Sequence, residues 1–397
     1  MMHDGSLAAN LDQIFILLRD WVVGFLPAVL RPAADAVLGV IAIICVFPAF
    51  FAVVVVLERK GVGRIQNRYG PNRVGPYGLF QPIADAIKAL IKEDIVPNRA
   101  DAVVHFMAPL VLLITVFMSF AVLPVGRNMA LVDMDSGLLF FIAMGAATEL
   151  SVFMAGWSSR NKYSLLGAIR AVAQMISYEV ILLLSTVTVV MITGSLSLTR
   201  IVEAQNHFTW ILPHWFIFTP WGVAAFVMFI IAGMAETNRS PFDVPEGESE
   251  IVAGYHTEYS GFKFAIFYIA EYLSMISISA LGATLFLGGW SAPLSFLNWV
   301  PSWIWFFAKV LIAMFVFIWV RGTVPRIRQD QLMNFAWKFL LPIALIDLVV
   351  TALWHFMGEG WMRWMVTAVI LVACWALMGR LEMRNRHIGP RKYRYAE

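Results

Sequence analysis

The sequence has few residues of the kinds that build redox and nucleotide sites. Its only two cysteines, Cys45 and Cys374, lie alone in apolar stretches, which excludes a CxxC pair and the four thiolates of an iron–sulfur cluster. GxGxxG, GxxxxGK[ST] and HExxH motifs are absent, so nucleotide and zinc-protease sites have no sequence basis. His105 and His355 could form a haem pair, but membrane histidines more often make hydrogen bonds between helices. We expect no catalytic residue and no metal ligand here, so any electrons must come from a partner.

Charge is also scarce, and this scarcity sets the protein class. Charged residues make up 14% and hydrophobic residues 60% of the 397 positions, against about 25% and 45–50% in soluble domains. Runs long enough to span a bilayer occur near 35–57, 103–125, 137–157, 163–193, 213–235, 263–289, 302–321, 336–356 and 363–379. The alternation of barrel strands is absent. The sequence therefore predicts an all-α, polytopic membrane helix bundle of about eight to nine transmembrane helices.

The distribution of lysine and arginine predicts the orientation. With the first span running inward, the inner segments and their flanks hold 21 lysines and arginines, whereas the outer ones hold four. Basic residues concentrate in cytoplasmic loops, so the long loops are predicted to be cytoplasmic, and the net charge of +3 is an orientation signal. Residues 1–34 lack the features of a secretory signal. We expect an interfacial helix near 11–30.

A polar insert, ERKGVGRIQNRYGPNRVGPYGLFQPIADAIK, follows the first span at 58–88. Phe80, Ile83, Ile87 and Leu90 recur at helical spacing, which predicts an amphipathic helix in the interface plane over about 79–94. The glycine and proline turns before it bend the chain back toward the bilayer. By physics alone, a membrane anchor and a binding site are equally good interpretations.

The second long loop, AETNRSPFDVPEGESEIVAGYHTEYSG at 235–261, is acidic. It holds six carboxylates against the single Arg239. Crowded carboxylates cannot all ionise, so the pKa of some rises and they exchange protons near neutral pH. A merely solvated acidic surface is the alternative interpretation.

Ionisable residues also lie inside the predicted spans. They are Glu149, Glu179, Glu271, Asp347, Arg170 and Lys309. A charge in hydrocarbon costs about 2.5–3.5 kcal/mol or more, so each should be paired, face the bundle interior or line a hydrated path. Glu271 and Glu149 are predicted roughly 12 Å deep and Glu179 roughly 24 Å deep. Such stepped carboxylates suit a proton relay, and static ion pairs with Arg170 or Lys309 are the alternative.

The insert, the acidic loop, AGWSSRNKYSLLGAIRAVAQMISYE at 155–179 and RGTVPRIRQDQLMNFAWKFLLP at 321–342 closely resemble the quinone-site membrane subunit of respiratory complex I. In bacteria this is the H subunit, whose mitochondrial homologue is NADH dehydrogenase subunit 1. The resemblance implies a membrane subunit of a proton-pumping NADH:quinone oxidoreductase. It would frame the ubiquinone tunnel and couple quinone reduction to proton translocation, without being catalytic alone.

The resemblance also implies roles for particular residues. Those lining or supporting the quinone tunnel would be Glu58, Arg59, Arg68, Asp85, Lys88, Arg239, Phe242, Asp243, Glu246, Glu248 and Glu250. Those of the proton relay would be Arg170, Glu179, Glu236, Glu271 and Lys309. Glu149 joins the relay by its depth alone, since many members carry an uncharged residue there. Ubiquinone is the expected substrate, and FMN and iron–sulfur clusters are expected only in partner subunits.

The resemblance covers about residues 35–356 and so divides the chain. Residues 1–34 form an N-terminal extension, and 357–397 add a helix and a basic cytoplasmic tail. The implied partners are peripheral-arm subunits, small membrane subunits and the bilayer of a bacterial inner membrane, with no nucleic acid. Two other functions stay open: a membrane subunit of an energy-converting hydrogenase, and a secondary transporter, although the halves show no internal repeat. A purely architectural anchor leaves the buried acids unexplained.

Overall fold

The computed structural model describes residues 11–209, 212–244, 247, 251–358 and 360–385, and these residues are almost entirely helical. The long helices are α3 (Arg31–Ile65), α5 (Ala102–Ala121), α6 (Gly137–Ser158), α7 (Lys162–Thr193), α9 (Pro220–Glu236), α11 (Gly261–Phe286), α12 (Ser302–Thr323), α14 (Leu341–Phe356) and α15 (Trp361–Asn385). Shorter ones are α2 (Ile14–Gly24), α4 (Gln81–Ile91), α8 (Leu198–Gln205) and α13 (Gln329–Phe335). One-turn helices lie at Pro76–Gly78, Phe216–Phe218, Gly254–His256 and Ser295–Leu297. A π-helical turn, Ala336–Leu340, joins α13 to α14.

The described residues contain eight helices long and apolar enough to cross a membrane, and α9 is a shorter apolar helix. The predicted all-α membrane bundle is therefore confirmed. The fifth span begins later than predicted, at Pro220 instead of near 213. Its expected first turns are replaced by a two-stranded hairpin, in which β1 (Phe208–Thr209) pairs with β2 (Leu212–Pro213), and by a one-turn helix. Pro220 then supplies a favourable first helical position.

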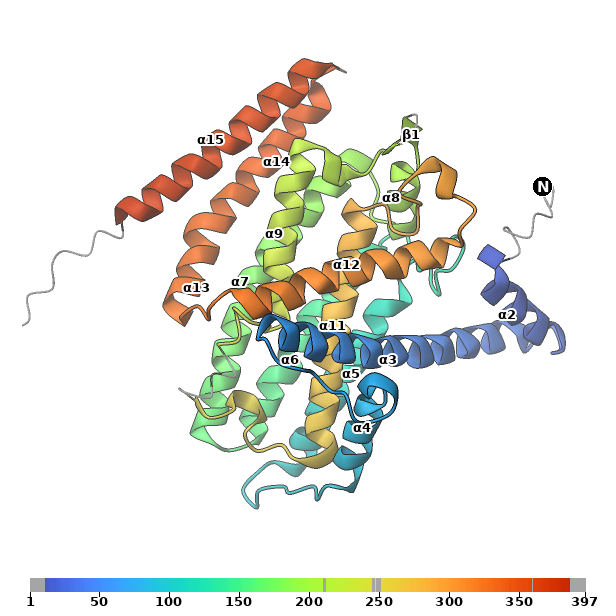
Figure 1. Cartoon of the computed structure of the whole chain (residues 1–397), viewed down its shortest axis with the longest axis vertical. Helices are drawn as coiled ribbons and strands as arrows, with labels where there is room; N and C mark the ends of the chain where they lie inside the picture. The colour runs from blue at the N-terminus through green and yellow to red at the C-terminus, as the bar shows by residue number, and fades with distance from the viewer. Residues whose placement is uncertain (1–10, 210–211, 245–246, 248–250, 359, 386–397) are drawn as a thin grey trace, which may run out of the picture.

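Helix α11 lies at the centre of the bundle (Figure 1). Two thirds of its most apolar window is buried, and Phe267, Leu273 and Leu281 are fully inaccessible. Helices α3 and α12 contact each other and lie close to the horizontal in Figure 1. Helices α7, α9 and α14 lie closer to the vertical. The first half of α3 projects from the bundle (Figure 1), and its first buried residue is Phe47.

Polar side chains at the helix starts fix where several spans begin. Asp101 accepts a hydrogen bond from the Val104 amide at the start of α5, and Asn161 accepts one from the Tyr163 amide at the start of α7. These caps satisfy amides that have no partner within the helix. The Asp101 amide also donates a hydrogen bond to the Ser158 carbonyl. This bond holds the turns 95–101 and 158–161 side by side.

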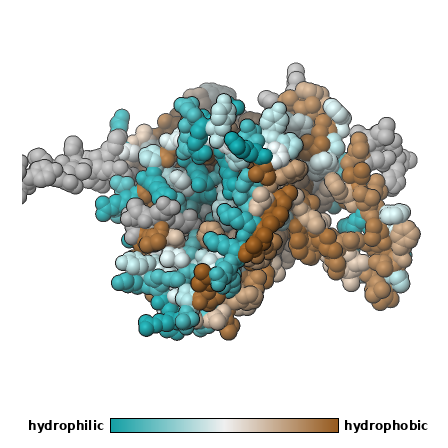
Figure 2. All heavy atoms as spheres, turned by 60° about the horizontal axis from the view of Figure 1, so that its bottom comes forward, coloured by the Kyte–Doolittle hydropathy of each residue, from teal (hydrophilic) through white to brown (hydrophobic). Residues whose placement is uncertain are grey.

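The predicted amphipathic helix is α4, which contacts both α3 and α11. Its apolar residues Ile83, Ile87, Leu90 and Ile91 are all more than half exposed, as expected for a helix that rests on a membrane or on a partner. Figure 2 brings this end of the molecule forward. Hydrophilic residues gather over part of this face, beside a strongly hydrophobic strip (Figure 2).

Candidate functional site

A large cavity of about 790 Å³ lies between α3, α4, α11 and the loop at 253–261. Of the predicted tunnel residues, Arg59, Asp85 and Lys88 line it. An Arg59 guanidinium nitrogen lies 2.6 Å from an Asp85 carboxylate oxygen, and the Gln81 amide donates to the same carboxylate at 2.9 Å. Arg59 on α3 and Asp85 on α4 thus form one polar edge of the cavity. The rest of the wall includes apolar side chains such as Phe51.

The aromatic residues of the 253–261 loop also shape the large cavity. Tyr259 lines it, donates a hydrogen bond to the His105 carbonyl at 3.2 Å and stacks on the His105 ring at 4.0 Å. Burial raises the pKa of Tyr259 to about 12, although a hydrogen bond with Ser158 opposes the shift. The Tyr259 hydroxyl therefore remains a neutral hydrogen-bond donor at physiological pH.

A buried charge cluster lies behind the large cavity. Glu58 on α3 is 4% exposed, and its Oε1 contacts the guanidinium groups of Arg321 and, at 3.7 Å, of Arg239. Arg239 also lies over the Tyr272 ring, 3.8 Å from its centroid. Burial lowers the pKa of Arg239, but Tyr272, Glu58 and Glu271 outweigh it and hold the pKa above its ordinary value. The two predicted residues Glu58 and Arg239 are thus brought together.

Two tyrosines connect this cluster to the cavity edge. The Tyr268 hydroxyl lies 2.9 Å from the Tyr272 hydroxyl, and Tyr268 lines the large cavity together with Arg59. Tyr272 in turn lies under the Arg239 guanidinium, so the two tyrosines link the cavity wall to the buried charge cluster.

Glu271 stands at the junction between this region and the bundle interior. Its Oε1 accepts a hydrogen bond from the Tyr255 hydroxyl at 2.8 Å and lies 3.2 Å from His256 Nε2. His256 lines the large cavity, whereas Tyr255 and Glu271 line a second, small cavity deeper in the bundle. The contact between His256 and Glu271 thus joins the two cavities.

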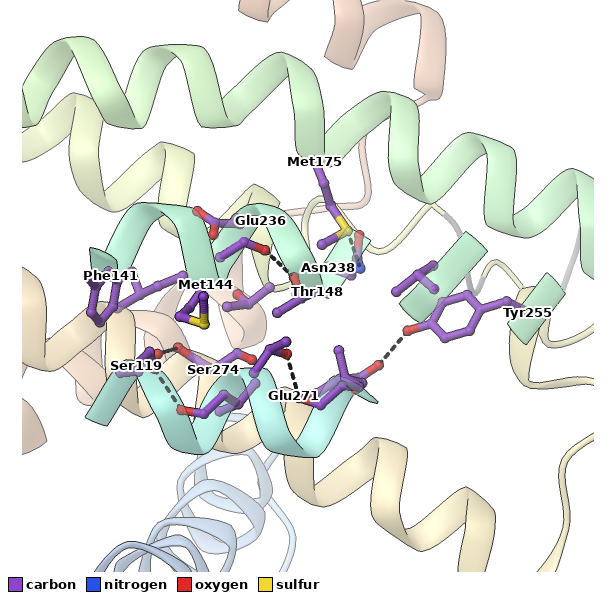
Figure 3. A pocket seen from close by; sticks show the side chains of 18 residues that line it. Ser119, Phe141, Met144, Thr148, Met175, Glu236, Asn238, Tyr255, Glu271 and Ser274 are labelled. Carbon is purple, nitrogen blue, oxygen red and sulfur yellow. Dashed lines mark hydrogen bonds between the residues drawn. The ribbon is translucent and has the colours of Figure 1, made fainter. Parts of the chain in front are cut away.

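The small cavity has a volume of about 40 Å³, enough for at least one water. Glu236 from α9 and Glu271 from α11 face it, together with Thr148 and Asn238 (Figure 3). Glu236 Oε2 is buried and has no hydrogen-bond partner among the described residues. Gly145 allows the Glu236 carboxyl to approach α6, because a Cβ at that position would lie 3.1 Å from Glu236 Oε1.

Beyond Glu236 lies a pair of carboxyl groups. Glu149 on α6 and Glu179 on α7 lie close enough to interact electrostatically with each other and with Glu236. Both residues are half-buried at the α6–α7 face. The structure thus assembles Glu271, Glu236, Glu179 and Glu149 into one series.

Other predicted residues lie apart from this series. The Lys309 amine donates to the carbonyls of Leu287, Gly289 and Ser291 at 2.6–2.8 Å and lies 4.2 Å from the centroid of the Trp215 ring. The interpretation that Lys309 pairs with a buried acid is therefore wrong for the described residues, because three carbonyls already use its three N–H groups. Asp347 on α14 is fully buried, and neither carboxyl oxygen has a hydrogen-bond partner among the described residues.

The rest of the predicted set is spread over the inserts. Arg170 is half-buried on α7, and Arg68 is exposed and donates to Gln66 at 2.8 Å. Phe242 is buried against Tyr178. Asp243 forms an ion pair with Arg326 at 2.7 Å. Glu246, Glu248 and Glu250 lie outside the described residues.

Sequence reasoning missed the residues that connect the predicted ones. They are Tyr255, His256, Tyr268, Tyr272 and Arg321. Three rings, Tyr255, His256 and Tyr259, belong to the motif AGYHTEYSG, whose density of polar rings was an available signal. The described residues contain no cluster of histidine, cysteine or acidic side chains that could hold a metal ion.

Comparison with known proteins identifies the family of the chain. A family model described as NADH dehydrogenase matches residues 38–352. The H subunit of NADH-quinone oxidoreductase from Dehalococcoides mccartyi strain CBDB1 is 52% identical over 296 residues, which is 75% of this chain and 80% of the relative. The corresponding proteins of Geobacillus kaustophilus and Paraburkholderia xenovorans are 47% and 46% identical over 79% and 80% of this chain and over 93% and 89% of their own lengths.

Proposed function

Because the chain belongs to the NADH dehydrogenase family, we propose that it is the membrane subunit of a proton-pumping NADH:quinone oxidoreductase that frames the quinone tunnel. It couples quinone reduction to proton translocation and is not catalytic alone. The iron–sulfur clusters reside in partner subunits, since this chain has only two separated cysteines, and FMN is likewise assigned to a partner. The observation that carries the proposal is the His256–Glu271 contact, which joins a large cavity at the polar face to an acid-lined cavity inside the bundle.

The large cavity is the proposed quinone site, with ubiquinone as the substrate. Its volume falls in the range of small-molecule sites. Phe51, Val55, Phe264 and Ile269 supply apolar wall for an isoprenoid tail. Arg59 and Lys88 supply N–H donors for the polar head. The exposed apolar residues of α4 support a cavity mouth at the membrane surface, where a lipid-soluble quinone would enter.

Quinone reduction supplies the signal that the carboxylates relay. A quinone that takes up two electrons from partner subunits and two protons becomes a quinol. A proton withdrawn from the His256–Glu271 pair changes the charge facing the small cavity. Glu236 and the Glu179–Glu149 pair then exchange protons through waters within hydrogen-bond reach.

The exposure of the terminal pair supports partners beside it in the membrane. Glu149 and Glu179 are half-buried, and their neighbours Leu150 and Ile176 are 59% and 49% exposed. Carboxyl groups facing lipid are costly, so small membrane subunits of the complex cover the deeper part of this face, around Leu150 and Ile176, and receive the relayed charge. Peripheral-arm subunits bind the hydrophilic face at the mouth of the large cavity.

Orientation and domain organisation complete the proposal. The excess of lysine and arginine in the long loops supports a cytoplasmic position for these loops, and the proposed membrane is a bacterial inner membrane. Residues 35–356 form the functional unit. The extensions 1–34 and 357–397 flank it, and α15 packs on α14 and α9.

The test blocks the large cavity. Ala265 on α11 lines it, so Ala265→Trp is expected to lower NADH:ubiquinone reductase activity in membranes at least about tenfold. NADH oxidation by a water-soluble acceptor, which partner subunits perform, should persist. The matched control is Ala376→Trp at an exposed position on α15, which should leave both activities unchanged.

Full quinone reductase activity in Ala265→Trp would refute the assignment of the cavity. The experiment also separates this function from that of a hydrogenase subunit. NADH-dependent, inhibitor-sensitive quinone reduction in the wild-type membranes supports the oxidoreductase. Hydrogen evolution in the absence of quinone reduction supports the hydrogenase.

A further inference from the structure

A basic concavity of about 500 Å³ lies on the polar face, outside the two cavities described above. Arg99, Arg160 and Lys162 line it, together with Asn161 and Glu258. All three cationic residues are exposed. Three separate segments contribute to it, so it is formed only by the folded chain.

The concavity carries an excess of positive charge. Its one carboxylate, Glu258, accepts a hydrogen bond from the Asn161 amide at 2.6 Å. Within the described part of the chain, Arg99, Arg160 and Lys162 form no ion pair. Three cations against one acid leave a net charge of about +2 that no described residue neutralises, and an anion is the complementary ligand.

Exposed aromatic residues place this concavity at the level of the membrane surface. Trp157, two residues before Ser159, is 57% exposed, and Tyr163, next to Lys162, is 45% exposed. Tryptophan and tyrosine gather where the membrane meets water. The Lys162 amine lies 5.4 Å from the centroid of the Tyr163 ring, so the cations and the aromatic rings occupy the same level.

An exposed apolar strip continues from these aromatic residues along the spans. Phe153 stacks on Trp157 on α6, with ring centroids 6.1 Å apart. On α7, Leu166 and Ile169 are 43% and 49% exposed. The strip therefore begins at the cations and runs into the depth of the membrane.

We propose that Arg99, Arg160 and Lys162 bind the phosphate of an anionic phospholipid, whose acyl chains lie on Phe153, Trp157 and Leu166. A phospholipid combines the negative head group and the apolar chain that this surface requires, whereas an acidic segment of a protein matches the cations but not the strip. Basic pockets at the ends of transmembrane helices suit such head groups. The inference does not depend on the quinone or proton path.

The test uses the assembled complex in phosphatidylcholine nanodiscs that contain a small fraction of phosphatidylglycerol with a photoreactive acyl chain. After irradiation, mass spectrometry is expected to find the adduct on peptides covering 153–169. Each of Arg99→Gln, Arg160→Gln and Lys162→Gln should reduce the adduct about fivefold, and the triple variant about a hundredfold. Arg328→Gln, which removes an exposed cation elsewhere, is the matched control and should leave the adduct unchanged.

Competition identifies the source of the phosphate. Unlabelled phosphatidylglycerol should displace the probe, whereas equal concentrations of phosphatidylcholine or inorganic phosphate should not. Displacement by inorganic phosphate would overturn the proposal, as would an unchanged adduct in the triple variant. Loss of peripheral subunits in that variant with an intact adduct would show a protein-docking surface instead. If the triple variant fails to assemble, the single variants decide the question.

Discussion

Replacement of Glu271 by glutamine tests the junction between the two cavities most directly. The amide has nearly the same shape as the carboxylate, so the packing of α11 should persist. It carries no charge and does not take up a proton at physiological pH. Glu271→Gln therefore removes the acid and keeps the volume.

The contacts of Glu271 set the size of the effect. Its carboxylate forms two close polar contacts, with Tyr255 at 2.8 Å and His256 at 3.2 Å. Hydrogen bonds to charged groups contribute about 1.5–3 kcal/mol each and neutral ones about 0.5–1.5 kcal/mol, so the variant should lose about 2–3 kcal/mol of stability. Loss of a positioned acid–base group slows a transfer that depends on it about a hundredfold or more.

The assay measures NADH:ubiquinone reductase activity and proton pumping in the same membrane vesicles. Both should fall at least about tenfold in Glu271→Gln, while NADH oxidation by a water-soluble acceptor persists. Tyr255→Phe removes one hydrogen bond but keeps the acid, so its loss should be only severalfold. Glu203→Gln, at an exposed position on α8, should behave as wild type. Unchanged pumping in Glu271→Gln, or an equal loss in Tyr255→Phe, would refute the role of the carboxylate.

Three further predictions follow from the same geometry. Glu179→Gln and Glu236→Gln should each lower quinone reduction and proton translocation together in a complex that still assembles, and full activity in both would end the relay hypothesis. A double-mutant cycle on Arg59→Gln and Asp85→Asn, measured through the KM for quinone, should give a coupling free energy of only about 0.5–1 kcal/mol, because both side chains are more than a third exposed. A coupling several times larger would show that the pair is desolvated in the working complex. Lys309→Met leaves three buried carbonyls without their donor, so it should destabilise the subunit by about 3–5 kcal/mol in thermal unfolding, and an unchanged melting temperature would contradict this role.

Much of the architecture was predictable because a bilayer imposes simple rules. Spans of about 20 apolar residues reveal themselves by length alone, and the periodicity of Ile83, Ile87 and Leu90 is enough to predict α4. The late start of α9 was not predictable in this way. Residues 212–219 are apolar enough to continue the span, but proline and the short hairpin hold them outside the helix.

The candidate site was predictable in its residues but not in their pairing. Sequence depth correctly brings Glu271 into the bundle interior, because it is a charged residue within an apolar helix, whereas Glu236 joined the predicted relay only through the family resemblance. It does not reveal that Glu179 meets Glu149 instead of Arg170, or that Lys309 binds carbonyls. Those outcomes depend on which helix faces which neighbour, and a periodic pattern contains no such information.

The sequence by itself determined the class of the protein, its helices, its charge asymmetry and the acidic residues inside the spans, whose burial in hydrocarbon costs free energy. Only the tertiary structure decided that His256 and Glu271 join the large cavity to the small one. The physical reason is that hydrophobic burial is encoded along each helix, whereas hydrogen bonds and ion pairs need two side chains within a few ångströms. That proximity arises when distant segments pack around α11.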